Sequence, residues 1–116
     1  MMTRKQHVDY WLHGASENMK DMRGAIKSKR RVMAMFCGHL AVEKMLKGLC
    51  AVRDIEVWRD HKLLNLADNA GLISSLTGEQ LNELATITSF KRDTTILKNV
   101  STTFVRLYIL PSGRKK

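Results

Sequence analysis

Apolar residues recur along the first ninety residues of this chain at the spacing of amphipathic helices. Near the N-terminus one stripe has steps of three and four, and it consists of Val8, Leu12, Ala15, Met19 and Met22. Thr3 stands just before this stripe and predicts the helix start, because its hydroxyl can accept from a backbone N–H of the first turn. We therefore expect a first helix that packs one face on a core.

A second and more apolar helix is expected from about Ser28 to Val52. One row of its apolar side chains consists of Met35, Val42, Leu46 and Leu49, and the row beside it consists of Val32, Phe36 and Leu40. Two adjacent apolar rows predict a helix that is buried over most of its surface.

Two further helices follow a polar stretch, "RDIEVWRDH", whose apolar residues fit no helical face and which is therefore expected to be a loop. In "DHKLLNLADNAG" Asp60 can cap a helix and Gly71 can end it, with Leu63, Leu64 and Ala67 facing inward. In "TGEQLNEL" Thr77 and Gln80 have the spacing of a capping box. The pattern predicts an all-α fold, an up-and-down bundle of four to five antiparallel helices.

Size and composition are those of one small domain. The chain has 116 residues, 44% of them hydrophobic and 27% charged, which is ordinary for a globular protein. Its apolar runs are too short for a membrane span or a signal peptide, so a cytoplasmic location is expected. Cys37 and Cys50 lack the close pairing of metal knuckles and redox motifs, so we expect core thiols, no metal site and no cofactor.

The net charge of +9 is concentrated at the C-terminal end. Residues 91–116 carry seven cations against Asp93 alone, which leaves +3 for residues 1–90. We therefore divide the chain into a helical bundle, 1–90, and a basic C-terminal segment, 91–116. A cationic segment attracts phosphate without sequence specificity, but a solvated end is the commoner meaning of such a run.

Polar side chains interrupt the apolar surface of the second helix at a four-residue spacing. His39, Glu43 and Lys47 share one face, where Glu43 can pair with Lys47 and accept from His39. This pattern is typical of an intrahelical ion pair, and it is also consistent with a polar groove for a ligand or a partner subunit.

Two other groups are candidates for ligand contact. Trp58 lies beside Arg59 and His61 in the sequence, so an aromatic ring that could stack on a base is next to a cation that could bind phosphate. The alternative is that Trp58 packs against the end of the bundle. Lys29, Arg30 and Arg31 fall at the first interhelical turn, where they are either solvated or in contact with phosphate.

Three segments resemble, in order and spacing, the prokaryotic HEPN domain: "FCGHLAVEKMLKGL", "DHKLLNLADNAGL" and "LTGEQLNELATITSF". The resemblance covers about residues 8–90. It implies a helical bundle that usually forms a homodimer, often encoded beside a small nucleotidyltransferase in a toxin–antitoxin pair, with a nucleotide or RNA as a possible ligand.

Some members of this family are ribonucleases marked by Arg, four to six residues and then His. Here Arg53 precedes His61 with seven residues between them, Arg31 precedes His39 with seven, and Arg4 precedes His7 with two. None fits, so we expect no catalytic residue of the family type. The sequence favours a non-catalytic binding and dimerisation module, with a ribonuclease toxin and a purely structural helical dimer as the alternatives.

The stretch "KRDTTILKNVSTTFVRL" after Phe90 has three interpretations. Leu97, Val100, Phe104 and Leu107 have helical spacing, which indicates a divergent fifth helix, although Thr, Val and Ile are mediocre helix formers. A basic arm for RNA or DNA is the second interpretation. The third is an altered reading frame, because a shift by two bases permits the Ala-Arg-Tyr and acidic residues typical of the family at this point.

Overall fold

The computed structural model describes residues 2–57, 59–89, 99–103 and 106–107. Its elements are α1 (Arg4–Lys27), α2 (Arg31–Val52), α3 (Leu63–Asn69), a short 3-10 helix η1 (Ile73–Ser75) and α4 (Gly78–Ser89). The described residues 99–103 and 106–107 are also helical. The predicted all-α helical bundle is confirmed.

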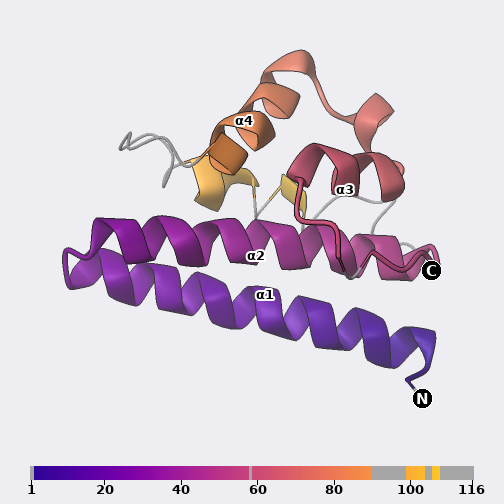
Figure 1. Ribbon diagram of the computed structural model, residues 1–116, viewed down its shortest axis with the longest axis horizontal. Coiled ribbons are helices and arrows are strands. Elements are labelled where there is room, and N and C mark those ends of the chain that lie inside the picture. Colours follow the sequence, from indigo (N-terminus) through magenta and orange to yellow (C-terminus); the bar gives the residue numbers. More distant parts are fainter. Residues whose placement is uncertain (1, 58, 90–98, 104–105, 108–116) are drawn as a thin grey trace.

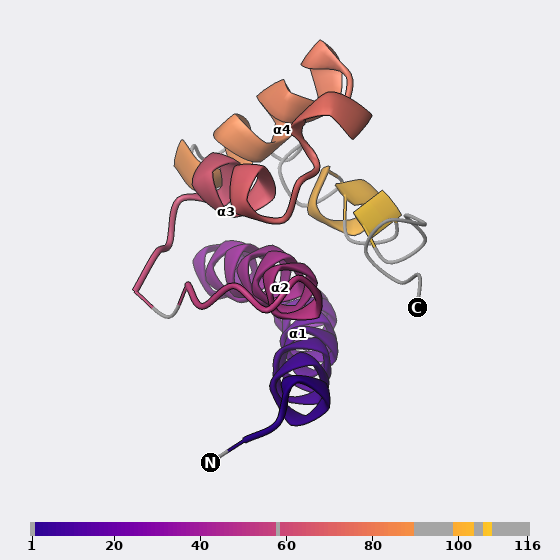
Figure 2. The ribbon, with the colours of Figure 1, turned by 90° about the vertical axis from the view of Figure 1, so that its right-hand side faces the viewer.

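Helix α2 is the central element of the bundle. It lies antiparallel to α1, while α3, α4 and the helical residues near the C-terminus cover its opposite side (Figures 1 and 2). Its core residues include Ala41, Val42 and Leu46, none of which is exposed. This arrangement explains why the sequence of α2 is apolar on most of its surface.

Glycines allow α1 and α2 to approach each other closely. A Cβ atom at Gly48 would lie 2.8 Å from Leu12 Cδ2 and 3.3 Å from Trp11 Cβ. Because these atoms belong to α1, a side chain at position 48 would require the end of the Leu12 side chain and the Cβ of Trp11 to move. Trp11 is thereby held against α2 with only 9% of its surface exposed.

The predicted starts of α1 and α4 are confirmed. Gln6 N donates to Thr3 Oγ1 at 3.1 Å, and Thr3 N donates to Gln6 Oε1 at 2.9 Å. The same reciprocal pair joins Thr77 and Gln80, with distances of 3.1 and 2.9 Å. Each box satisfies N–H groups that a helix start leaves without a partner.

Three predictions about the second helix and the turn before it need correction. Helix α2 begins at Arg31 rather than Ser28, because Ser28 and Lys29 close α1 and Lys29 adopts the left-handed conformation, φ 60°. Val32 and Phe36 do not face the core: they are 61% and 51% exposed. The turn therefore presents apolar side chains to solvent, next to its cations.

The predicted start of the third helix is also wrong. Helix α3 begins at Leu63, and the Asp60 carboxylate accepts from Lys62 N at 3.1 Å in the preceding loop instead of capping the helix. Leu64 is half-exposed and Leu66 is buried in its place. The predicted stop is confirmed, since Gly71 follows the helix with φ 76°.

The described residues of the C-terminal segment pack on the bundle. Val100 and Leu107 are buried, and Arg106 Nη1 lies 3.0 Å from Glu83 Oε1 on α4. The altered reading frame concerns residues 91–98, which lie outside the described residues, and it stays a prediction. Phe104 lies outside them as well.

Candidate functional site

The carboxylate of Glu43 is the centre of a buried polar cluster on α2. Lys47 Nζ lies 3.1 Å from Glu43 Oε2, and His61 Nδ1 lies 2.7 Å from the same oxygen. His39 Nδ1 lies 3.6 Å from Glu43 Oε1, which is beyond hydrogen-bond distance. Because a carboxylate only accepts, the His61 Nδ1–H is the donor.

Burial separates the members of this cluster. The side chains of His39, Glu43 and Lys47 are 10%, 7% and 3% exposed, whereas that of His61 is 69% exposed. The three helix residues are thus part of the protein interior, and His61 is the side chain that a ligand can reach. His39, Glu43 and Lys47 share one face of α2 as predicted, but this face is buried rather than open to solvent.

The cluster connects three parts of the chain. Lys47 Nζ lies 5.1 Å from the centre of the Trp11 ring on α1, within reach of a cation–π interaction. His61 belongs to the loop between α2 and α3. Helix α1, helix α2 and this loop are therefore joined through adjacent charged and aromatic side chains.

Burial also decides the protonation of nearby groups. The pKa of His39 is lowered below its usual 6.5 by desolvation, an effect that the negative charge of Glu43 opposes and the neighbouring His61 reinforces. Burial raises the pKa of the Cys37 thiol, and it raises that of Cys50 to about 11. Both cysteines are buried thiols, which confirms the prediction that they belong to the core. Cys50 Sγ lies 3.4 Å from Leu66 O.

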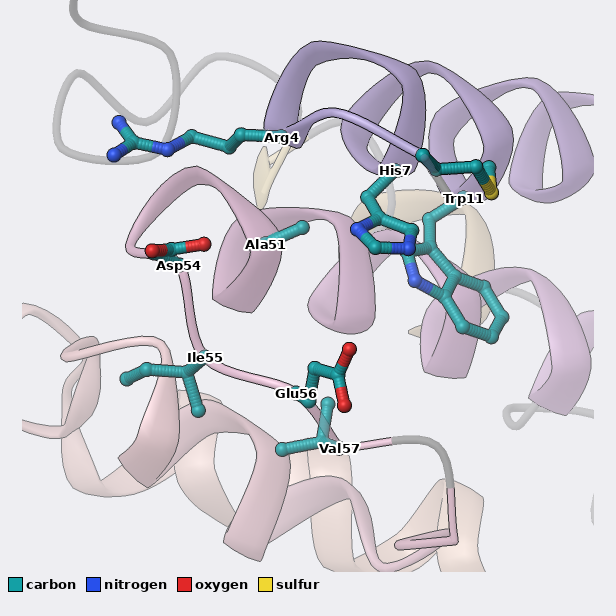
Figure 3. A pocket seen from close by; sticks show the side chains of 9 residues that line it. Arg4, His7, Trp11, Ala51, Asp54, Ile55, Glu56 and Val57 are labelled. Atoms are coloured by element: carbon teal, nitrogen blue, oxygen red, sulfur yellow. The ribbon is translucent and has the colours of Figure 1, made fainter.

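A separate pocket of about 250 Å³ lies between the start of α1 and the loop after α2 (Figure 3). The first wall consists of Met2 and of Arg4, His7 and Trp11 on α1. The facing wall consists of Ala51, Asp54, Ile55, Glu56 and Val57. The pocket thus places a guanidinium, an imidazole and an aromatic ring opposite two carboxylates.

Arg4 and Asp54 lie at one end of this pocket, and the Glu56 carboxylate points towards His7 and Trp11 at the other (Figure 3). Of these residues the sequence drew attention to Arg4 and His7, as a pair whose spacing does not fit the ribonuclease motif. It gave no signal for Asp54 and Glu56, because the pocket brings together segments about fifty residues apart.

The basic turn forms a third feature. Lys29, Arg30 and Arg31 line one surface hollow of about 280 Å³ together with Ile26. The sequence predicted that these three cations are either solvated or in contact with phosphate, and the structure brings them together. It does not join them to the Glu43 cluster or to the pocket at the start of α1.

The other predicted ligand residues occupy different surroundings. Arg59 is exposed and lines a shallow hollow with Glu56, Val57, Asp60 and Asn69. Trp58 lies outside the described residues. Within the described part of the chain no group of three His, Cys, Asp or Glu side chains could hold a metal ion.

Comparison with known protein families identifies the family of this chain. The model of the HEPN domain matches residues 8–99, which is most of the chain. The chain belongs to the HEPN family. The match extends beyond Phe90, where the resemblance was expected to end. No curated protein and no solved structure gives a significant match.

In the described part of this HEPN chain, no helix has the length and apolar character needed to cross a bilayer.

We predict that the Glu43–Lys47 pair is strongly coupled. Replacing Glu43 by Gln removes the carboxylate that faces the buried Lys47 ammonium, which should lower the free energy of unfolding by about 3 kcal/mol. The double variant Glu43→Gln/Lys47→Met, which also removes the cation, should be more stable than Glu43→Gln alone. Urea unfolding of the wild type, both single variants and the double variant measures this coupling.

His61→Ala is the matched control, because His61 also contacts Glu43 but is largely exposed. Its expected loss is about 1 kcal/mol or less. Additive losses for Glu43→Gln and Lys47→Met would contradict the coupling.

Proposed function

We propose that this chain is a non-catalytic HEPN module that dimerises, binds a nucleotide or RNA ligand and works with a nucleotidyltransferase partner in a toxin–antitoxin type system. The observation that carries the binding role is the basic turn. Lys29, Arg30 and Arg31 line one surface hollow, and residues 22–42 contain no acidic residue that would neutralise them. An RNA backbone supplies the missing negative charge.

The Glu43 cluster supports a non-catalytic role. Acid–base cleavage of RNA requires a titrating group that can reach the phosphate and the 2′-hydroxyl. His39 and Glu43 are nearly buried, and Glu43 is already in contact with Lys47 and His61. The groove around His39, Glu43, Lys47 and His61 stays a prediction as a ligand site, with His61 as its exposed member.

Exposed apolar side chains support the dimerisation role. Val32, Met33 and Phe36 lie on the solvent side of α2, with 61%, 48% and 51% of their surfaces exposed. Packing this face against a second copy buries apolar area. A two-fold axis across α2 would make the two helices antiparallel, so the basic turns of the two copies would lie at opposite ends of the interface.

We predict that the basic turn dominates RNA affinity. The triple variant Lys29→Ala/Arg30→Ala/Arg31→Ala should bind a labelled single-stranded RNA more weakly, and the slope of log K against log salt should shrink by about 2. Fluorescence anisotropy across a salt series measures both quantities. Because cations at the start of α2 oppose its helix dipole, their removal should not weaken the fold.

Lys5→Ala/Lys20→Ala/Lys62→Ala is the matched control, since it removes the same charge from exposed sites elsewhere. Equal losses of RNA affinity in the two triple variants would mean that only net charge matters, which would contradict a specific site at the basic turn. In the presence of chelator the RNA should stay intact. RNA cleavage that disappears in His39→Ala would instead establish the ribonuclease alternative.

We predict a dimer that Phe36 stabilises. Sedimentation velocity of the wild type should give twice the chain mass of 13.3 kDa. Phe36→Glu should shift the protein to the monomer, because a charge buried in an apolar interface lacks a partner. Ile73→Glu, a change at an exposed apolar residue outside α2, should leave the dimer intact. A monomeric wild type, or a dimer in Phe36→Glu, would refute this interface.

A further inference from the structure

We propose that the pocket between the start of α1 and residues 54–57 binds a guanine mononucleotide, with Glu56 facing the base and Arg4 facing the phosphate. The inference takes its ligand class from the proposed function and adds the site and the base. It concerns a different surface from the basic turn, so the two can fail independently.

The charge of the pocket selects against a long polyanion. The residues that line it include one guanidinium, Arg4, and two carboxylates, Asp54 and Glu56. The chain as a whole carries +9, so this pocket differs from the surface around it. A ligand that fits must bring hydrogen-bond donors for Glu56 at one end of the pocket. At the other end it must bring a negative group for Arg4 and a donor for Asp54, which lies beside Arg4 (Figure 3).

Guanine meets the first requirement. Its N1–H and exocyclic amine form a pair of adjacent donors, which a carboxylate can accept in a bidentate manner. Adenine presents one amine beside the N1 lone pair, and that lone pair would repel the second carboxylate oxygen. The direction of Glu56 towards Trp11 places this acceptor beside an aromatic side chain that lines the pocket with the 9% of its surface that is exposed (Figure 3).

Arg4 meets the second requirement. It lies at the end of the pocket away from Glu56 (Figure 3), and a guanidinium pairs with phosphate through two parallel hydrogen bonds. The volume of about 250 Å³ is below the range typical of drug-sized ligands, so it suits a ligand no larger than one nucleotide.

Both walls of the pocket are held in place before a ligand arrives. Trp11 is fixed between Gly48 and the Lys47 ammonium. The opposite wall begins at the end of α2, where Asp54 N donates to Ala51 O at 2.9 Å and Ile55 N donates to Cys50 O at 3.0 Å. Such pre-organisation lowers the entropic cost of binding a small molecule.

Asp54 occupies a position that favours glycine. Its φ is 62°, in the left-handed region where a side chain costs free energy. Lys29 ends α1 in the same conformation, so strain alone does not mark a site. At position 54, however, the residue that accepts this cost also contributes a carboxylate to the pocket.

Isothermal titration calorimetry of the full chain with GMP, AMP, guanosine and inorganic phosphate tests the proposal. GMP should bind at least tenfold more tightly than AMP. Glu56→Gln should weaken GMP about tenfold and reduce this preference, because an amide cannot accept from both guanine donors. Arg4→Gln should weaken GMP but leave guanosine unchanged, since guanosine has no phosphate.

Glu79→Gln and Arg23→Gln are the matched controls, because they make the same changes at exposed residues outside the pocket. Both should bind GMP like the wild type. Arg4 and Glu56 are themselves exposed, so their variants should keep the melting temperature.

Three results would overturn the inference: no heat with GMP at millimolar concentration, equal affinity for AMP and GMP, or GMP binding that survives Arg4→Gln and Glu56→Gln. If RNA still binds through the basic turn in any of these cases, the proposed function stands and only this pocket is wrong. If the basic turn fails and GMP binds as described, the chain is a nucleotide-binding module and only the RNA-binding role of the basic turn is wrong.

Discussion

The ion pair between Glu43 and Lys47 is the interaction on which the rest of this structure depends. Both side chains are nearly buried, and charges in a protein interior are tolerated only when they are paired. Their further contacts lead outwards, from Lys47 to Trp11 on α1 and from Glu43 to His61 in the loop before α3. The pair therefore contacts both helix α1 and the loop that leads from α2 to α3.

Local sequence signals predicted those parts of the fold that depend on neighbouring residues. The capping boxes at Thr3 and Thr77 and the stop at Gly71 each involve residues close in sequence, and all three are present. The start of α3 was missed because Asp60 has two local uses for its carboxylate, and the loop geometry selects the bond to Lys62 N. Val32 and Phe36 were assigned to the core because periodicity identifies an apolar face but not what covers it.

The candidate sites depend on tertiary contacts and were predictable only in part. A spacing of four residues correctly placed His39, Glu43 and Lys47 on one face of a helix. The spacing did not reveal that α1 and the loop before α3 cover this face. The face is therefore a buried ion pair rather than an open groove. The pocket at the start of α1 gave no pattern at all, because Arg4 and Glu56 become neighbours only after α1 and α2 pack together.

In this HEPN chain the internal pairing of Glu43 is the observation behind our proposal of a binding module, for which we propose contacts at the basic turn and the pocket rather than at the centre of α2. The most direct test of a buried, internally paired cluster is an NMR pH titration of the His39 imidazole in the wild type and in Glu43→Gln. The account predicts a His39 pKa below 6.5, and a still lower value in the variant, where the charge that favours the imidazolium is gone. A His39 pKa at or above 6.5 that does not respond to Glu43→Gln would mean a solvated imidazole and would contradict the account.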